Sequence, residues 1–214
     1  HSCPTQRSSD LTMKVLVGCE ESQIVTMAFR KLGHKAFSCD IQECSGGYPE
    51  YHIKHDIMDV ILQDEWDLII LHPPCTKIAV SGNRWYGTGK TLHYQRIEAV
   101  QWTQELWNLA ISVSKYVALE NPVGVLNTMG NFPKPDYIQP WQFGHGETKK
   151  TGLWLYNLPP LIPTKIVNGR EQRVWKMPPS EDRGKLRSKT YEGIAEAMAC
   201  QWSEYIMNQS DADS

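Results

Sequence analysis

The sequence predicts an α/β protein built on a Rossmann-like, mostly parallel sheet with helices on both faces. Apolar runs that suit strands alternate with segments of helical periodicity between Met13 and Leu119, as in right-handed βαβ units. Several of these runs are continuously apolar, which is typical of parallel strands buried on both faces. The chain has 214 residues, of which 41% are hydrophobic, and this is enough for one domain with a sizeable core.

The first half of the chain supplies most of the expected sheet. Val15–Val17 is an uninterrupted apolar run, whereas Ile24, Met27 and Ala28 recur at helical spacing and Gly33 follows as a stop signal. The expected elements, in order, are a strand at Lys14–Cys19, a helix at Glu21–Leu32, a strand at His34–Ile41, a short strand or extended turn at His52–Ile57 and a strand at Trp66–Leu71.

The second half is less regular. Ile78–Thr91 is rich in glycine and polar residues, which predicts a mobile loop. The expected elements after it are a helix at Leu92–Ser114, a strand at Tyr116–Leu119, a late strand at Gly152–Leu155 and a helix at Tyr191–Met207. Prolines and aromatic residues break the pattern over residues 129–190, which predicts a small irregular C-terminal lobe. We therefore expect a leader or disordered tail at 1–12, one domain at 13–207 and a disordered tail at 208–214.

Basic side chains gather in the predicted lobe. Ten Lys or Arg residues and three Asp or Glu residues lie between Lys149 and Lys189, so this stretch carries a net charge of +7. The whole chain carries only −2, so the remainder is acidic. A local basic face is typical of phosphate binding, and a solvated loop region is the alternative interpretation.

Other features of the sequence limit the compartment and the cofactors. No run approaches the roughly 18 apolar residues that a membrane span needs, so no membrane partner is expected. Residues 1–12 lack the apolar core of a signal peptide, which favours a reducing, cytoplasmic compartment. The six cysteines form no C-x-x-C pair, and no metal site is expected. The sequence does not indicate an oligomeric state.

Polar or reactive residues stand at the carboxyl ends of five expected strands. Open parallel sheets bind their ligands beyond these ends. The residues are Gly18-Cys19-Glu20, Asp40, Asp56, Pro73-Pro74-Cys75 and Glu120-Asn121-Pro122. Because parallel strand ends share one edge of the sheet, we expect these residues to converge on a single site.

The residues at the ends of the first three expected strands suit a nucleoside cofactor. A helix that begins after the first strand offers free backbone N–H groups to an anionic group, such as the carboxylate of S-adenosylmethionine. Asp40 is placed to accept both hydroxyls of a ribose, and Asp56 could accept from an adenine amine. The alternative for Asp40 is a helix N-cap or a turn residue. The first loop lacks G-x-G-x-x-G, which argues against a dinucleotide.

The residues at the ends of the fourth and fifth expected strands suit covalent chemistry. We expect an electropositive site to lower the pKa of the Cys75 thiol, and the two prolines before it to hold the turn rigid. The alternative is a cysteine that packs as a small hydrophobic side chain. Glu120 ends the adjacent expected strand and could face the same pocket. A thiol and a carboxyl group on one heterocycle suit covalent addition followed by proton transfer.

With these residues the chain resembles the cytosine-5 DNA methyltransferases, and most closely a short family of such proteins encoded by phages and prophages. The resemblance is carried, in order, by residues 15–23, 38–40, 72–75, 120–124, 139–144, 149–155 and 193–199. It implies a class I methyltransferase fold, S-adenosylmethionine as cofactor and DNA as partner. It also implies that the target base is flipped out of the duplex, because carbon 5 is hidden in the stack.

The resemblance assigns roles to individual residues. It implies catalytic roles for Cys75, the nucleophile that adds to carbon 6, and for Glu120, Pro74 and Asn121. It implies cofactor contacts at Gly18, Cys19, Glu20, Ser22, Gln23, Asp40, Ile41, Asp56, Ile57 and Pro73. Together with the basic lobe, it points to DNA contacts at Arg84, Lys90, Lys149, Lys150, Thr151, Arg183 and Arg187.

The chain departs from the family at several places, among them Lys149-Lys150-Thr151, where the family has a Gln-x-Arg-x-Arg strand. Gly18-Cys19-Glu20-Glu21-Ser22 replaces the Phe-x-Gly-x-Gly-Gly cofactor loop, and only residues 129–149 could serve as a target-recognition segment. Two alternatives therefore stay open. The pocket could modify a free pyrimidine nucleotide or an RNA base, or the domain could bind DNA or a partner protein without catalysis.

Overall fold

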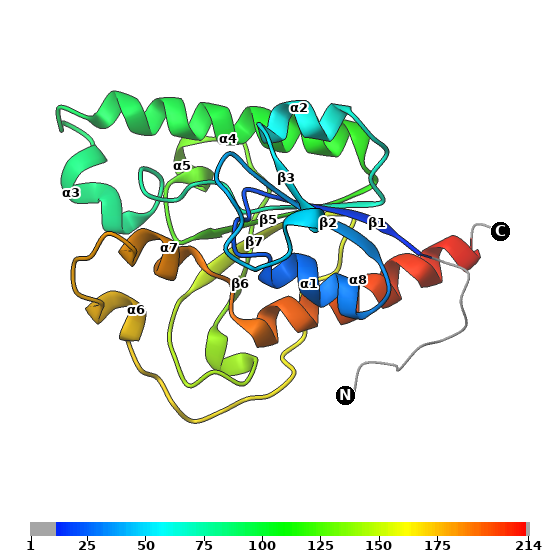
Figure 1. Ribbon diagram of the computed structural model, residues 1–214. Helices are drawn as coiled ribbons and strands as arrows, with labels where there is room; N and C mark the ends of the chain where they lie inside the picture. Colours follow the sequence, from blue (N-terminus) through cyan, green and yellow to red (C-terminus); the bar gives the residue numbers. More distant parts are fainter. Residues whose placement is uncertain (1–11, 213–214) are drawn as a thin grey trace.

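The computed structural model describes residues 12–212 and contains one seven-stranded sheet at its centre (Figure 1). The strands lie in the order β3-β2-β1-β4-β5-β7-β6. Their bounds are β1 Lys14–Gly18, β2 Lys35–Asp40, β3 His52–Lys54, β4 Leu68–Leu71, β5 Tyr116–Pro122, β6 Asp136–Ile138 and β7 Thr151–Tyr156. Strands β1 to β5 pair with one another in parallel, and β7 runs antiparallel to both β5 and β6. The predicted α/β fold with a mostly parallel sheet is confirmed.

Helices cover both faces of the sheet. Successive residues of a strand point to opposite faces, so each strand contributes side chains to both cores. Val15 and Val17 of β1 belong to the core beneath α1 (Ile24–Lys31) and α8 (Glu192–Ala212). Leu16 belongs to the core beneath α2 (Ile57–Leu62) and α4 (His93–Val113). Burial of each such aliphatic side chain contributes roughly 1.5–3 kcal/mol, so both layers stabilise the sheet.

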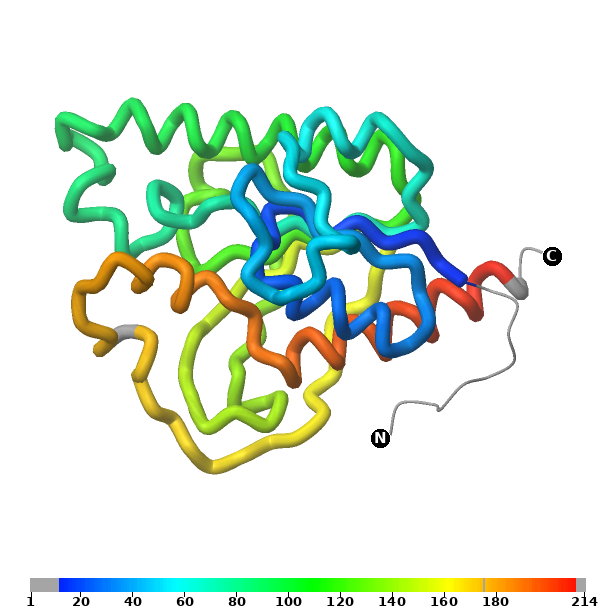
Figure 2. Tube along the Cα trace, in the orientation of Figure 1, coloured from blue at the N-terminus to red at the C-terminus, as the bar shows by residue number. Residues whose placement is uncertain are grey.

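The order of the strands fixes where a ligand can bind. From β1 the chain builds outward through β2 and β3, and it then returns to place β4 and β5 on the other side of β1. The carboxyl ends of β1 and β4 therefore diverge at a topological switch point, where α/β sheets bind ligands. Figure 2 shows the chain around α3 (Asn83–Tyr86) and α7 (Arg183–Ser188) meeting at this edge of the sheet.

Short helical segments complete the chain outside the two main layers. They are η1 Pro49–Tyr51, η2 Val80–Gly82, α5 Leu126–Met129, η3 Pro140–Gln142 and α6 Arg173–Lys176. Two of the structure's differences from prediction lie here. The expected mobile loop at Ile78–Thr91 contains η2 and α3, and the expected irregular lobe adds the unpredicted strand β6 to the sheet. These elements were missed because they are too short for a periodicity to show, whereas β7 corresponds to the late strand predicted at Gly152–Leu155.

The ends of the chain and α2 also differ from prediction. The expected strand or turn at His52–Ile57 stops at Lys54, and Ile57 instead begins α2. Helix α8 runs to Ala212, so the predicted tail at 208–214 begins too early, and residues 213–214 lie outside the described residues. Of the predicted leader at 1–12, only Thr12 is described.

Two further findings concern the part of the chain between residues 12 and 212. None of its helices combines the length and apolar character that crossing a membrane would require. Within the same residues, His, Cys, Asp and Glu side chains form no group of three or more that could hold a metal ion.

Candidate active site

The first strand ends in a tight contact with its neighbours. A Cβ atom on Gly18 would lie 2.6 Å from Cδ1 of Ile57 and 2.9 Å from Cδ2 of Leu71. A residue with a side chain would therefore require the side chains of Ile57 and Leu71 to shift. The glycine thus lets these elements close around the switch point, and Ile57, a predicted cofactor contact, is buried beneath it.

The carboxylate of Glu20 occupies the amino end of α1. Its Oε1 accepts the backbone N–H of Val25 at 2.7 Å, and Oε2 accepts the N–H and the hydroxyl of Thr26 at 3.2 and 2.7 Å. We expected these N–H groups to be free for the carboxylate of a cofactor, and that expectation is wrong. Glu20 is buried and itself supplies the anion that a helix amino end favours.

Replacement of Glu20 by alanine should lower the free energy of unfolding by about 1–2 kcal/mol, because α1 would lose its capping carboxylate. Chemical denaturation monitored by circular dichroism measures this change. Glu50→Ala removes an exposed glutamate from the same half of the chain and should leave stability nearly unchanged. Equal stability of the two variants would refute the capping role.

Gln23 and Cys19 hold the rest of this loop in an unusual conformation. Both have left-handed backbones, with φ of 60° and 59°, which is uncommon for residues other than glycine. The Gln23 side chain donates to the carbonyl of Tyr48 at 2.8 Å and accepts the Tyr48 N–H at 3.1 Å. Gln23 is fully buried and fastens a neighbouring loop, whereas Ser22 beside it is half-buried.

Acidic groups surround the end of β1. Burial, followed by the carboxylates of Asp40 and Asp56, raises the pKa of the Cys19 thiol far above its ordinary value. Oε2 of Glu21 is buried, and within the described chain it has no hydrogen-bond partner. An acidic strand end with an unpaired buried carboxylate oxygen suits a cationic ligand. The ammonium and sulfonium groups of S-adenosylmethionine are such cations, so these residues fit this cofactor.

Asp40 and Asp56 also have structural roles. Asp40 accepts the N–H of Gln42 at 2.9 Å, in a turn, and Asp56 caps α2 by accepting the N–H of Met58 at 2.8 Å. The turn role that the sequence left open for Asp40 is therefore present in the structure. Ile41, expected beside the cofactor, is 72% exposed and free to cover a ligand.

Cys75 lies at the mouth of a large cavity. Its carbonyl accepts the N–H groups of Ile78 and Ala79 at 3.0 and 2.8 Å, which fixes the turn after β4. The cavity has a volume of about 590 Å³, within the range typical of ligand pockets. Its wall combines Cys75 with aromatic residues of α3 and basic residues of the lobe, namely Trp85, Tyr86, Lys149, Lys150 and Arg187.

The pKa of the Cys75 thiol is higher than we expected. Burial and the nearby Glu120 raise its pKa, and Lys149 and Arg187 lower it only in part. The prediction that the site lowers the pKa of this thiol is therefore wrong for the free protein, because loss of hydration outweighs the two cations. A bound ligand that displaces water or pairs with Glu120 would change this balance.

Glu120 is held by a histidine at the end of the adjacent strand. Nδ1 of His72 donates to Oε2 of Glu120 at 2.8 Å, and only 9% and 11% of the two side chains are exposed. Burial raises the pKa of Glu120, but the hydrogen bond from His72 and the nearby Lys149 ammonium outweigh it, so the pKa lies below its ordinary value. Asn121 ties the same strands together by donating to the carbonyl of Pro73 at 2.9 Å.

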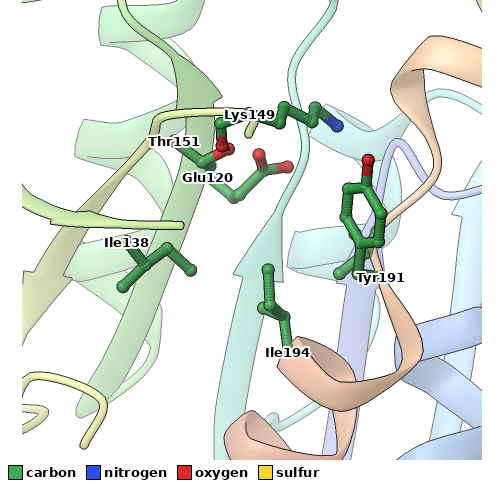
Figure 3. Close-up of a pocket in the computed structure, with 7 residues that line it drawn as sticks. Glu120, Ile138, Lys149, Thr151, Tyr191 and Ile194 are labelled. Carbon is green, nitrogen blue, oxygen red and sulfur yellow. The ribbon is translucent and has the colours of Figure 1, made fainter. Parts of the chain in front are cut away.

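A second, small cavity of about 10 Å³ is lined by Glu120 (Figure 3). The carboxyl group of Glu120 faces Lys149 and Tyr191 there, with Thr151 beside them. Lys149 lines both cavities, and its ammonium group interacts electrostatically with the Cys75 thiol and with the Glu120 carboxylate.

The structure brings together only some of the predicted DNA contacts. Lys149, Lys150 and Arg187 line the large cavity, and Thr151 lines the small one. Arg84 and Lys90 are exposed outside that lining. Arg183 is half-buried, and within the described residues its Nε has no hydrogen-bond partner.

Two residues of the site were missed as functional candidates. His72 stands directly before the two prolines at a strand end, which was the available signal for its contact with Glu120. Arg96 gave no signal, because an arginine in a helix is usually exposed. It is 3% exposed and donates to the carbonyls of Lys77 and Ala79 and to Oδ1 of Asn83, so it anchors the cavity wall.

Similar folds occur among solved methyltransferases. EhMeth of Entamoeba histolytica matches with a TM-score of 0.51 and 13% identity, over 74% of this chain and 58% of its own. An E. coli prophage protein described as a DNA modification methyltransferase gives 0.49 and 13%, over 73% and 52%. Dnmt2 of S. pombe gives 0.43 and 10%, over 78% and 54%.

The similarity to EhMeth defines the class of fold. The chain has a methyltransferase fold, and it spans little more than half the length of each solved structure that it matches. No protein-family model and no curated protein matches the sequence.

Proposed function

We propose that this protein is an S-adenosylmethionine-dependent methyltransferase that acts on carbon 5 of cytosine in DNA. The observation that carries this proposal is the meeting of Cys75 and Glu120, from the ends of β4 and β5, beside a basic and aromatic cavity. The fold that the chain shares with EhMeth supports the same class of reaction.

The cofactor would bind where the acidic residues gather at the ends of β1 and β2. Glu21, Asp40 and Asp56 would hold its cationic and hydroxyl groups, and Gly18 would let it approach the sheet. When bound, S-adenosylmethionine supplies the methyl group that carbon 5 of the base accepts.

The chain's own residues prepare the base. The Cys75 thiolate adds to carbon 6, which breaks the C5–C6 π bond and moves its electron pair toward carbon 5 and the ring nitrogen N3. Glu120 contacts N3 and the exocyclic amine and so stabilises this charge. After methylation, a water molecule takes the proton from carbon 5, and the electrons of that bond expel the Cys75 thiolate.

The cavity wall suits an unstacked nucleotide. Trp85 and Tyr86 offer aromatic surfaces for stacking, and the cations Lys149 and Arg187 face them from the lobe. Lys150 lies over the ring of Tyr137, with Nζ 4.4 Å from the ring centroid, at the rim of the same cavity. A base flipped from a duplex meets both kinds of contact.

Replacement of Arg187 by alanine should weaken DNA binding about threefold to tenfold at low salt and equally for all sequences, because it removes one phosphate contact. The slope of log K against log salt concentration should shrink by about one. Fluorescence anisotropy at several salt concentrations measures both effects. Lys35→Ala, an exposed change at the amino end of β2, is the control. An unchanged slope for Arg187→Ala would exclude a phosphate contact.

Transfer of labelled methyl from S-adenosylmethionine tests the proposed reaction directly. Duplex DNA, single-stranded DNA, RNA and free pyrimidine nucleotides should be compared side by side, and label is expected in 5-methylcytosine of DNA. Label only in RNA or in nucleotides would reject DNA as the substrate. Calorimetry that detects no cofactor binding at millimolar concentration would reject an enzyme of this class.

A further inference from the structure

We propose that His72 is a positioning residue that holds Glu120 and passes a proton to it during the addition of Cys75 to the base. This inference rests on the function proposed above. The geometry that carries it is the 2.8 Å hydrogen bond from Nδ1 of His72 to Oε2 of Glu120, in which both side chains are almost entirely buried.

Addition to carbon 6 creates a need for this proton. The electron pair released from the C5–C6 bond makes N3 basic, and an ionised carboxylate has no proton to give it. The pKa of Glu120 is lowered, so the lone carboxyl group is ionised near neutral pH. The missing proton comes from the hydrogen-bonded pair, because His72 and Glu120 in direct contact can share one.

The proton moves without any further reactant. As the sulfur–C6 bond forms, the proton on Nδ1 of His72 passes to the Glu120 carboxylate, and Glu120 passes it on to N3. When Cys75 leaves, N3 returns its proton to Glu120, and the same hydrogen bond carries it back to His72. Each group is regenerated at the end of the cycle.

Two backbone features keep His72 in place for this role. Its N–H donates to the carbonyl of Gly18 at 2.9 Å, and Pro73 follows it directly. Nε2 of His72 is buried, and within residues 12–212 it has no hydrogen-bond partner. The ring is therefore oriented by one contact, the one with Glu120.

Other charged groups face the pair and must be included in any pH dependence. Lys149, before β7, and Cys75, in the turn after β4, interact electrostatically with Glu120. Tyr191 of the segment before α8 faces the same small cavity, but its hydroxyl donates to Glu147 at 2.5 Å. The pKa of the Cys75 thiol is raised, so the fraction of Cys75 present as thiolate keeps increasing as the pH rises.

The test compares wild type with His72→Asn. The amide N–H of asparagine can replace Nδ1 as a hydrogen-bond donor, but it cannot release a proton to Glu120. At pH 7 the kcat for methyl transfer to DNA should fall by about 10- to 100-fold while KM for DNA changes less than about twofold. In wild type, loss of the shared proton opposes the gain of thiolate, so kcat levels off or falls as the pH rises. In the variant, kcat should keep rising with the thiolate.

His34→Asn is the matched control, because His34 is buried and hydrogen-bonded at the opposite edge of the sheet. A His72→Asn enzyme with the wild-type rate and pH profile would overturn the inference. Should that variant not fold, a wild-type kcat that rises with pH as steeply as thiolate formation would overturn it. An inactive wild type would instead refute the proposed function, which is a separate outcome.

Discussion

Replacement of Cys75 by serine is expected to lower methyl transfer to DNA by at least about 10³-fold, which corresponds to about 4 kcal/mol of transition-state stabilisation. A serine hydroxyl is a far weaker nucleophile than a thiolate, and Glu120 beside it would oppose its ionisation further. Label transfer under single-turnover conditions measures the effect without interference from product release.

Binding of the cofactor should survive this change. Cys75 lies in the turn after β4, whereas the acidic groups expected to hold S-adenosylmethionine gather at the ends of β1 and β2. Calorimetry should therefore give wild-type affinity for the cofactor. Cys44→Ser, a free and half-buried cysteine in another loop, should keep full activity. A Cys75→Ser enzyme that methylates at the normal rate would show that another group attacks the base.

Replacement of Arg96 by methionine should lower the free energy of unfolding by about 3 kcal/mol, because three buried or partly buried hydrogen bonds, each worth about 1 kcal/mol, would be lost. The acceptors are the carbonyls of Lys77 and Ala79 and the side chain of Asn83. Burial lowers the pKa of the Arg96 guanidinium. Through its hydrogen bonds this group holds the segment after Cys75 in place.

The same change should disturb the cavity. Ala79 pairs with Gly124 in an isolated bridge, and a Cβ on Gly124 would lie 2.4 Å from the carbonyl of Ile78, so this wall tolerates little displacement. Urea unfolding measures stability, and DNA affinity reports the wall. Arg84→Met, an exposed arginine of α3, should leave stability within about 0.5 kcal/mol of wild type. Equal stability of Arg96→Met and Arg84→Met would contradict the anchoring role.

The sheet could be predicted because its signal is strong. Continuous apolar runs give β1 and β4, and each is followed by residues that cannot continue a buried strand. Helix α2 was missed, because the six residues Ile57–Leu62 are too few to distinguish helical from strand periodicity. The late strand β7 was predicted at Gly152–Leu155, but β6 was missed, because its three residues show no period and it pairs with β7 across a long connection.

The site shows the same division between local and long-range signals. Sequence order alone indicated that Cys75 and Glu120 would meet, since both end adjacent strands. The occupation of the α1 amino end by Glu20 could not be predicted, because it depends on the path of the loop through Cys19 and Gln23. The raised pKa of Cys75 likewise depends on burial by segments far apart in the sequence.

The central claim is that the thiol of Cys75 bonds to carbon 6 of a cytosine. Incubation of wild type with S-adenosylmethionine and duplex DNA that contains 5-fluorocytosine tests it most directly, because fluorine replaces the proton that must leave carbon 5 and so traps the adduct. Mass spectrometry of the digested complex should find one nucleotide linked to the peptide that contains Cys75. A complex linked through another residue, or methylation of ordinary DNA with no trapped complex, would contradict the account.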